Sequence, residues 1–136
     1  MDGIFRKTKV NDLDFALSTL SQKNRVIARN IANADTPFYK SSKIEFSEVM
    51  AEYMGQGSAK PLYTTHEKHM QVGSTPPDIE GFIRRQNNPS LRTDMNDVNL
   101  DYEMSEQAGT SILFSMLSEI AGNKFGGLKS VISGRS

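Results

Sequence analysis

Side chains that could carry chemistry are few in this chain of 136 residues, and two histidines are the best candidates. His66 and His69 are separated by two residues, a spacing that places two imidazoles on one face of a helix, where they could bind a metal ion. Glu67 lies between them, but no third ligand stands at a supporting spacing, and the surrounding sequence is threonine-rich. We therefore predict that the chain has no metal site.

Paired carboxylates and nucleophile motifs give no better candidate for catalysis. The pairs Asp94–Asp97 and Asp101–Glu103 are typical of a solvated helix start. The sequence has no glycine-rich phosphate loop and no serine-nucleophile motif. It also has no cysteine, which excludes disulfides and thiolate catalysis. These observations predict no catalytic residue, no cofactor and no enzymatic activity.

The balance of charge argues against nucleic acid as a partner. Sixteen basic and sixteen acidic residues give a formal net charge of zero, whereas a dedicated nucleic-acid binder carries a basic excess. The longest apolar runs, such as Ile112–Phe114, are far too short to span a bilayer, so we expect no direct membrane insertion. The first residues contain no apolar segment of the kind found in cleavable signal peptides. If the protein is exported, we expect a route without a cleaved signal.

An amphipathic helix is predicted near the start of the chain, over residues 11–33, with Asn11 or Asp12 as its N-cap. Its apolar residues recur at alternating spacings of three and four, which is the a/d pattern of a coiled coil. Asn24 interrupts the pattern, either as a buried residue that sets the register of the helix pair or as a surface residue. The pattern consists of Val10, Leu13, Leu17, Leu20, Asn24, Ile27 and Ile31.

A second long helix is predicted over residues 98–122, starting at Asp97 or Asn99 and weakened afterwards by three glycines, with one or two further turns. Its apolar residues stand four apart, which overshoots the helical turn by about 40° at each step. The stripe therefore winds around the helix, and one straight partner cannot cover all of it. The stripe consists of Leu100, Met104, Ala108, Ile112, Met116 and Ile120, with Leu113, Leu117 and Ala121 beside it.

The middle of the chain is predicted to be less regular. Apolar residues between Phe46 and Tyr53 follow helical spacing, which indicates a short helix that ends at Gly55. Glycines and prolines then punctuate residues 55–94, where only Leu62–Thr65 resembles an extended piece. So long a stretch without periodicity is a flexible loop, a linker or a segment that a partner orders.

Together these patterns predict a mainly α fold in which long N- and C-terminal amphipathic helices pair as a coiled coil. A short helix and a largely irregular middle segment, with or without a small β element, connect them. We divide the chain into an N-terminal arm (1–9), the first coiled-coil helix with its turn (10–40), the short helix (41–54), the middle segment (55–94) and the second coiled-coil helix with its tail (95–136).

The stretch Asn30–Lys40 ends the first helix, because Pro37 lacks the N–H that a helix needs and pushes Thr36 out of the helical conformation. It is either simply a helix end or a joint at which one subunit contacts its neighbours. The winding stripe favours subunit contacts, because the apolar surface exceeds what one intrachain partner covers. The expected interface residues are Leu13, Leu17, Leu20, Asn24, Ile27, Asn30, Ile31, Asn33, Thr36, Pro37, Leu100, Met104, Ala108, Ile112, Leu113, Met116, Leu117 and Ile120.

Four stretches of the sequence resemble the bacterial flagellar axial proteins, the family of rod, hook and hook-associated subunits. They are Asn30–Lys40, Thr64–Met70, Asp94–Met104 and Lys124–Lys129, and the short length points to the subunits of the proximal rod. Phe38 stands where the family usually has glycine, and Met95 and Asn99 stand where glycine and aspartate are more usual. The conformation of both turns is therefore open.

The resemblance implies a structural subunit of the proximal rod that polymerises through its terminal helices into the axial drive shaft and is required for motility. It also implies export by the flagellar type III apparatus and a place in the periplasmic rod of the basal body. The implied partners are the protein itself, other rod proteins, and the adaptor and export-gate proteins at the rod base. The alternative is a soluble cytoplasmic coiled-coil module that binds or regulates a partner helix without forming a filament.

Overall fold

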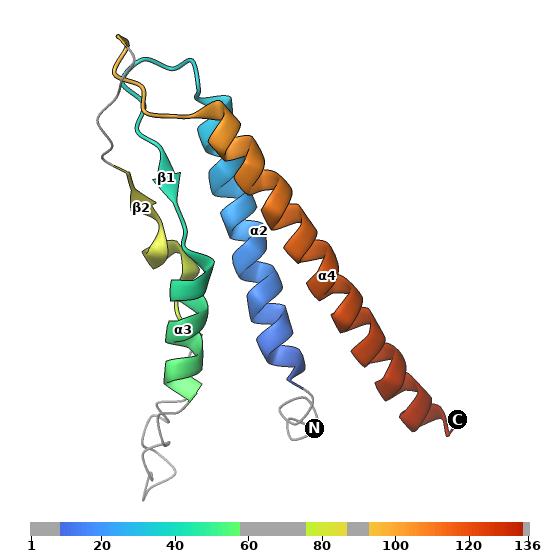
Figure 1. Ribbon diagram of the computed structural model, residues 1–136. Helices are drawn as coiled ribbons and strands as arrows, with labels where there is room; N and C mark the ends of the chain where they lie inside the picture. The colour runs from blue at the N-terminus through green and yellow to red at the C-terminus, as the bar shows by residue number, and fades with distance from the viewer. Residues whose placement is uncertain (1–8, 58–75, 87–92, 135–136) are drawn as a thin grey trace, which may run out of the picture.

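A computed structural model describes residues 9–57, 76–86 and 93–134 of the chain. Helix α2 is the central element, with α4 on one side and a short helix with a small two-stranded sheet on the other (Figure 1). The elements in chain order are α2 (Val10–Ala32), β1 (Ser42–Lys43), α3 (Phe46–Gly57), the 3-10 helix η1 (Ile79–Phe82), β2 (Arg84–Arg85) and α4 (Leu100–Ser133).

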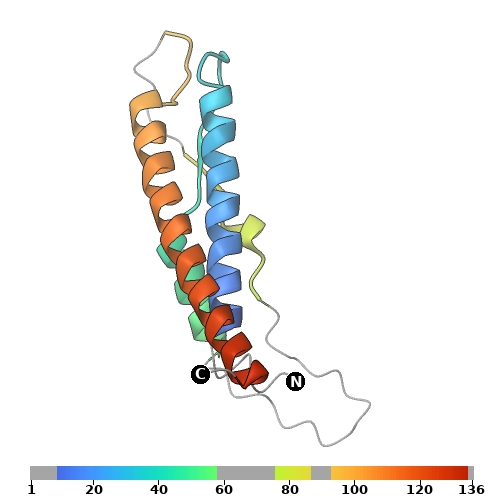
Figure 2. The ribbon, with the colours of Figure 1, turned by 90° about the vertical axis from the view of Figure 1, so that its right-hand side faces the viewer.

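Helices α2 and α4 lie side by side and run in opposite directions, as both views show (Figures 1 and 2). Leu20 and Ile27 of α2 are buried, and Lys23 forms an ion pair of 2.7 Å with Glu106 of α4. The predicted pairing of the two terminal helices, and with it the mainly α fold, is confirmed. The helices diverge toward the C-terminus of α4, which has 34 residues against 23 in α2 (Figure 1).

The start of α2 differs from the prediction. The helix begins at Val10 after Lys9, which adopts a left-handed conformation (φ 55°) and provides no side-chain cap. Asn11 and Asp12 lie inside the helix, so the predicted N-cap is wrong. The Asp12 carboxylate instead accepts a hydrogen bond of 3.1 Å from the Tyr53 hydroxyl of α3, which ties the first turn of α2 to its neighbour.

The start of α4 agrees with one of the two predicted caps, since the Asn99 side chain accepts a hydrogen bond of 3.1 Å from the Tyr102 N–H. The further turns predicted beyond residue 122 are present, but the helix continues through three glycines to Ser133 and is longer than predicted. Each glycine costs a helix interior about 1 kcal/mol, which one long uninterrupted helix tolerates. The helix ends where Gly134 adopts a left-handed conformation (φ 63°), a common C-terminal stop.

A small core lies on the other face of α2. Phe15 and Val26 of α2 pack with Ile44 and with Val49 of α3. Tyr53 stacks on Phe15 with ring centroids 4.2 Å apart. Helix α3 passes through Gly55 to Gly57, so its predicted end is two residues early.

Part of the middle segment is ordered around this core. Ile79, Phe82 and Ile83 pack against it, and β2 pairs antiparallel with β1. The largely irregular middle segment expected over 55–94 therefore includes a short ordered piece at residues 76–86, and β2 within it is the small β element that the sequence left open. Leu62–Thr65 and both histidines lie outside the described residues. None of the helices in the described ranges is both long enough and apolar enough to cross a membrane.

Candidate assembly interface

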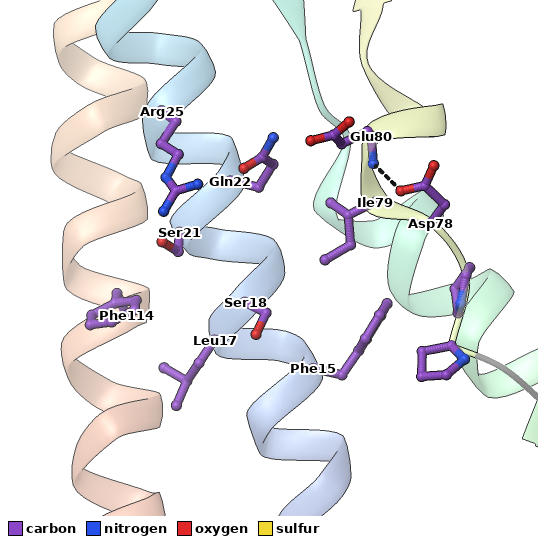
Figure 3. Close-up of a pocket in the computed structure, with 12 residues that line it drawn as sticks. Phe15, Leu17, Ser18, Ser21, Gln22, Arg25, Asp78, Ile79, Glu80 and Phe114 are labelled. Atoms are coloured by element: carbon purple, nitrogen blue, oxygen red, sulfur yellow. Dashed lines mark hydrogen bonds between the residues drawn. The ribbon is translucent and has the colours of Figure 1, made fainter.

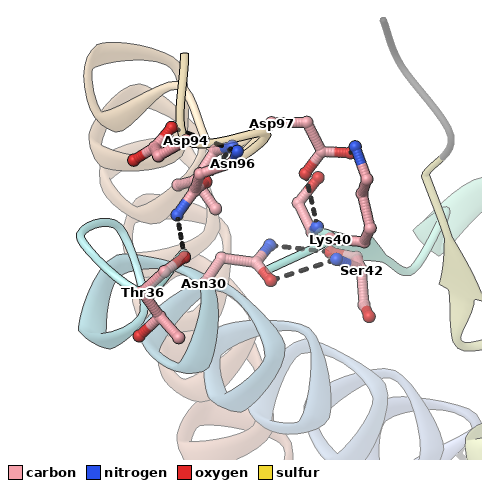
Figure 4. Close-up of polar contacts among 9 residues, drawn as sticks. Asn30, Thr36, Lys40, Ser42, Asp94, Asn96 and Asp97 are labelled. Atoms are coloured by element: carbon pink, nitrogen blue, oxygen red, sulfur yellow. Dashed lines mark hydrogen bonds and ion pairs between the residues drawn. The ribbon is translucent and has the colours of Figure 1, made fainter. Parts of the chain in front are cut away.

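Asn30 joins three elements at the end of α2 and is only 1% exposed. Its amide nitrogen donates to the Ser42 carbonyl of β1 (2.8 Å) and to a carboxylate oxygen of Glu103 in α4 (3.0 Å). Its amide oxygen accepts from the Ser42 N–H (3.0 Å) and from the Tyr39 hydroxyl (3.2 Å). An amide side chain has two donor hydrogens and two acceptor lone pairs, so its whole hydrogen-bonding capacity is used inside the chain. Figure 4 shows the two bonds with Ser42.

Asn96, in the segment that leads into α4, also forms hydrogen bonds across this junction and is 1% exposed. Its amide nitrogen lies 2.9 Å from each of three backbone carbonyls, those of Asn33, Ala34 and Thr36. Its amide oxygen accepts from the Val98 N–H at 2.8 Å, just before α4 begins. We call the two side chains, Asn30 and Asn96, the asparagine clasp, because they hold the end of α2 to the entry of α4 (Figure 4).

Backbone bonds continue the junction between residues 38–41 and 94–97. The Phe38 N–H donates to the Asp94 carbonyl at 2.9 Å. The Ser41 N–H donates to an Asp97 carboxylate oxygen at 2.6 Å, and the other oxygen of Asp97 lies 3.9 Å from the Lys40 ammonium. Two segments more than fifty residues apart in sequence are therefore locked into one unit.

Two residues in this unit have a left-handed backbone. Phe38 has φ 62° and Met95 has φ 61°, a conformation that costs a residue with a Cβ roughly 1–2 kcal/mol. At these two positions the resemblance described above implies glycine, and the turns have the left-handed conformation for which glycine is suited. Both side chains point into solvent, with exposures of 75% and 57%.

Two of the four carboxylates that were predicted to form a solvated helix start, Asp97 and Glu103, have buried side chains, whereas Asp101 is exposed as predicted. Glu103 is 7% exposed, and burial raises its pKa above the ordinary value of 4.5, with the hydrogen bond from Asn30 acting in the opposite direction. The Asp97 side chain is 1% exposed. Lys43 lies near Glu103, and its hydrogen bond with Glu45 raises the pKa of the ammonium group. The prediction fails for these two residues because Asn30 contacts Glu103, and Ser41 and Lys40 contact Asp97, across sequence distances that the local sequence does not reveal.

The outer surface of α4 is apolar and open. Ile112 is 62% exposed and Met116 is 55% exposed, and within the described residues no other element covers them. The same holds farther along the helix, where Val131 and Ile132 are more than 80% exposed. The other large apolar residues exposed on α4 are Leu100, Tyr102, Met104, Leu113, Phe114, Ile120 and Phe125.

The residues expected at a subunit interface fall into three groups according to their burial. Leu20, Ile27 and Asn30 are buried within the single chain. Leu13, Leu17, Asn24, Ile31, Asn33 and Leu117 are half-buried along the helix pair. Thr36, Pro37, Leu100, Met104, Ala108, Ile112, Leu113, Met116 and Ile120 are exposed.

Asn24 has features of both predicted alternatives, a buried residue of the helix seam and a surface residue. The residue as a whole is half-buried, but its amide oxygen is buried and has no hydrogen-bond partner among the described residues. That arrangement costs stability in the way expected of an asparagine in a coiled-coil seam.

In the part of the chain that the structure describes, no group of three or more His, Asp or Glu side chains could hold a metal ion.

The chain is similar over most of its length to flagellar basal body rod proteins. The FlgB protein of Bacillus subtilis (strain 168) is 33% identical over 125 residues, which cover 92% of this chain and 93% of that protein. The FlgB protein of Escherichia coli (strain K12) is 35% identical over 125 residues, covering 88% and 89%. This chain belongs to the FlgB family. No protein-family model matches it.

Membership of the FlgB family makes the chain a structural protein of the flagellar basal body rod, and the basal body is its location. A rod protein works in association with the other components of that rod. The FlgB relative from Cereibacter sphaeroides (strain ATCC 17029 / ATH 2.4.9) is more distant, at 31% identity over 119 residues, but it too is covered over 89% of its length. The similarity therefore extends over nearly the whole length of the chain.

Sequence reasoning missed Asn96 and Glu103 as key residues of this FlgB-family chain. Asn96 lies in the stretch that carries the family resemblance, but its three carbonyl partners are 60 to 63 residues away in sequence. Glu103 meets Asn30 across 73 residues. The one usable signal is the pair of asparagines, Asn30 and Asn33, at the end of the first helix, because an amide side chain can both donate and accept hydrogen bonds.

Proposed function

We propose that this chain polymerises in the rod through the outward faces of its paired terminal helices, and that it has no catalytic role. The observation that carries the proposal is the apolar surface of α4, where Ile112 and Met116 stand more than half exposed. A monomeric protein rarely leaves so large an apolar surface in water, because burying it is worth about 25 cal/mol per Å². Contact with neighbouring subunits would remove this surface from water.

The proposal divides the expected interface residues by their burial. Leu20, Ile27 and Asn30 hold the helix pair together within one subunit, whereas the exposed residues of α4 contact its neighbours. Pro37 and Thr36, which are exposed at the end of the helix pair, are candidates for contacts along the rod axis. The finer partners that we propose are further copies of the chain, other rod proteins, and the adaptor and export-gate proteins at the rod base.

Delivery is part of the same proposal. We infer export by the flagellar type III apparatus without a cleaved signal, followed by assembly in the periplasmic part of the rod. The FlgB relatives support this because they share the basal body location and nearly the whole length of the chain. The cytoplasmic regulatory module has no comparable support.

The test compares two substitutions of isoleucine by aspartate. Ile112→Asp alters an exposed residue, so it should preserve the helix content of the monomer. It should weaken concentration-dependent assembly at least tenfold, because each apolar side chain that is buried in a contact contributes about 1.5–3 kcal/mol. Ile27→Asp places a charge at a residue 4% exposed and should unfold the monomer instead. Circular dichroism measures the fold, and sedimentation velocity measures assembly.

Ile112→Val is the matched control, because it keeps an apolar side chain at the same place and should assemble like the unmodified chain. In cells whose only FlgB-family protein is the variant, Ile112→Asp should abolish swimming at normal expression. Normal swimming and unchanged sedimentation of that variant would show that the outer face of α4 is not an interface.

A further inference from the structure

A groove runs along α2 between η1 and α4, with a volume of about 710 Å³ (Figure 3). Its floor is made of small side chains of α2, Ser18 and Ser21. Apolar side chains stand at its borders, with Ile79 of η1 on one side and Phe114 of α4 on the other. The narrow side chains of the floor leave room for another helix to approach α2 closely.

Two opposite charges stand along this open face of α2. Asp14, Ser18, Ser21 and Arg25 follow one another at spacings of four, three and four residues, so they lie on one face of the helix. Asp14 and Arg25 are exposed, and neither has an ion-pair partner in the described part of the chain. Eleven residues separate them, a rise of about 16 Å along the axis.

The outward face of α4 carries the complementary arrangement. Glu119, Gly122, Gly126 and Lys129 are exposed and follow at spacings of three, four and three residues. Ten residues separate the two charges, a rise of about 15 Å. A Cβ placed on Gly122 or Gly126 would meet nothing within 4 Å, so the space outside the helix at both positions is open. Within the described residues, neither Glu119 nor Lys129 forms an ion pair.

The order of the charges along the two helices determines whether α4 of one copy lies parallel or antiparallel to α2 of the other. If α4 of a neighbour lies antiparallel to α2, Glu119 meets Arg25 and Lys129 meets Asp14, and both pairs attract. If it lies parallel, Glu119 meets Asp14 and Lys129 meets Arg25, and both pairs repel. The charge pattern therefore favours the antiparallel approach and disfavours the other.

We propose that the α4 face of one copy, Glu119 to Lys129, docks in the α2 groove of a second copy. With Glu119 opposite Arg25, Gly126 comes opposite Ser18, and the missing side chain of the glycine allows close packing of the two helices. The same register continues toward the apolar part of α4, where Met116 comes opposite Ala28, an exposed small residue.

The proposed contact is heterologous, because a groove on one copy receives a different surface of the next, and such a contact generates an open assembly unless it closes into a ring. The proposed contact also agrees with an assembly in which all subunits point in the same direction. The α4 helices of two such copies point the same way, and α4 runs opposite to α2 within each copy (Figure 1). This inference rests on the proposed function and names the surfaces that meet.

Charge reversal gives the first test. Arg25→Glu and Glu119→Arg should each weaken assembly about tenfold, because an attractive pair becomes a repulsive one. The double variant Arg25→Glu/Glu119→Arg should restore assembly to within about threefold of the unmodified chain. A double variant that assembles no better than the worse single variant would overturn the proposed pairing.

Disulfide formation between variants gives the second test, and the absence of native cysteine makes every disulfide intermolecular. Ser18→Cys and Gly126→Cys, prepared as separate chains, should form a mixed dimer under mild oxidation when combined, and neither should dimerise comparably alone. Ser115→Cys replaces an exposed residue about 16 Å from Gly126 along α4 and is the matched control for the second partner.

Three results would overturn the docking geometry: dominant self-dimers of Ser18→Cys, dominant self-dimers of Gly126→Cys, or equal pairing of Ser18→Cys with Ser115→Cys. Sedimentation of the same samples separates this inference from the proposed function. If Ile112→Asp prevents assembly but the Ser18–Gly126 disulfide does not form, only the docking geometry fails. If Ile112→Asp assembles normally, the proposed function itself fails.

Discussion

Replacing Asn30 by alanine should remove most of the stability of the clasp. The substitution removes the Asn30 partner of four groups, of which three are buried: the Ser42 N–H, the Ser42 carbonyl and the Glu103 carboxyl group. The fourth, the Tyr39 hydroxyl, is only part-buried. Each buried polar group without a partner costs about 1–3 kcal/mol, which gives a loss of about 3–9 kcal/mol. Water that enters the vacated space would satisfy part of this demand, so we expect a loss of about 3–5 kcal/mol.

The assay is urea unfolding of the dilute chain, followed by far-ultraviolet circular dichroism. At about 2 kcal/mol per molar urea, the expected loss lowers the midpoint of unfolding by about 2 M. Asn33→Ala is the matched control, because Asn33 makes its hydrogen bonds to the Arg29 carbonyl (2.8 Å) and the Thr36 hydroxyl (3.2 Å) at the exposed surface. Water can replace both partners, so this variant should lose at most about 1 kcal/mol. Equal losses for the two variants would refute the argument that the burial of Asn30 makes it decisive.

Three further predictions concern strain, ionisation and the helix seam. Phe38→Gly and Met95→Gly should each raise the free energy of unfolding by about 1 kcal/mol by relieving the left-handed strain, whereas Phe38→Ala, which keeps the Cβ, should bring no gain in urea unfolding. The folded state holds the Glu103 proton more tightly than the unfolded state, so the stability of the unmodified chain relative to Glu103→Gln should be greatest below pH 4.5 and fall as the pH rises through the raised pKa. Thermal unfolding across this range checks the sign, and a difference independent of pH would contradict it. Asn24→Leu should raise stability by about 1–2 kcal/mol by removing a buried acceptor without a partner, and a loss in urea unfolding would show that the oxygen is satisfied by water.

The sequence predicted the two long helices because their signals are local and repeated. The alternating spacing from Val10 to Ile31 covers six steps, and no proline or glycine interrupts it. The end of α4 could not be predicted in the same way. Glycine propensity alone favours a stop near Gly122, whereas the helix continues to Ser133, where the left-handed Gly134 ends it.

The small core beside α2 illustrates a different limit. Ile79, Phe82 and Ile83 are three apolar residues among prolines, glycines and charges, and their spacing of i, i+3 and i+4 is helical but covers little more than one turn. They pack against the cluster formed by Phe15, Val26, Ile44 and Val49, which only the tertiary fold brings together. A pattern of a single turn is too short to predict an element from the sequence, so the place of this segment in the fold follows only from its tertiary contacts.

The two explanations offered by the sequence for Asn30–Lys40, a helix end or a joint between subunits, apply to different residues of the stretch. Asn30 makes four hydrogen bonds within the chain and has no capacity left for a neighbour, so its role is to hold α2, β1 and α4 together. Pro37 and Phe38 have the opposite character, because they are exposed and the Phe38 side chain is held outward by its backbone conformation. A substitution at Asn30 should therefore affect folding before assembly. A polar replacement of the Phe38 side chain should leave folding intact, and its effect on assembly would then measure whether this end of the helix pair contacts a neighbour in the rod.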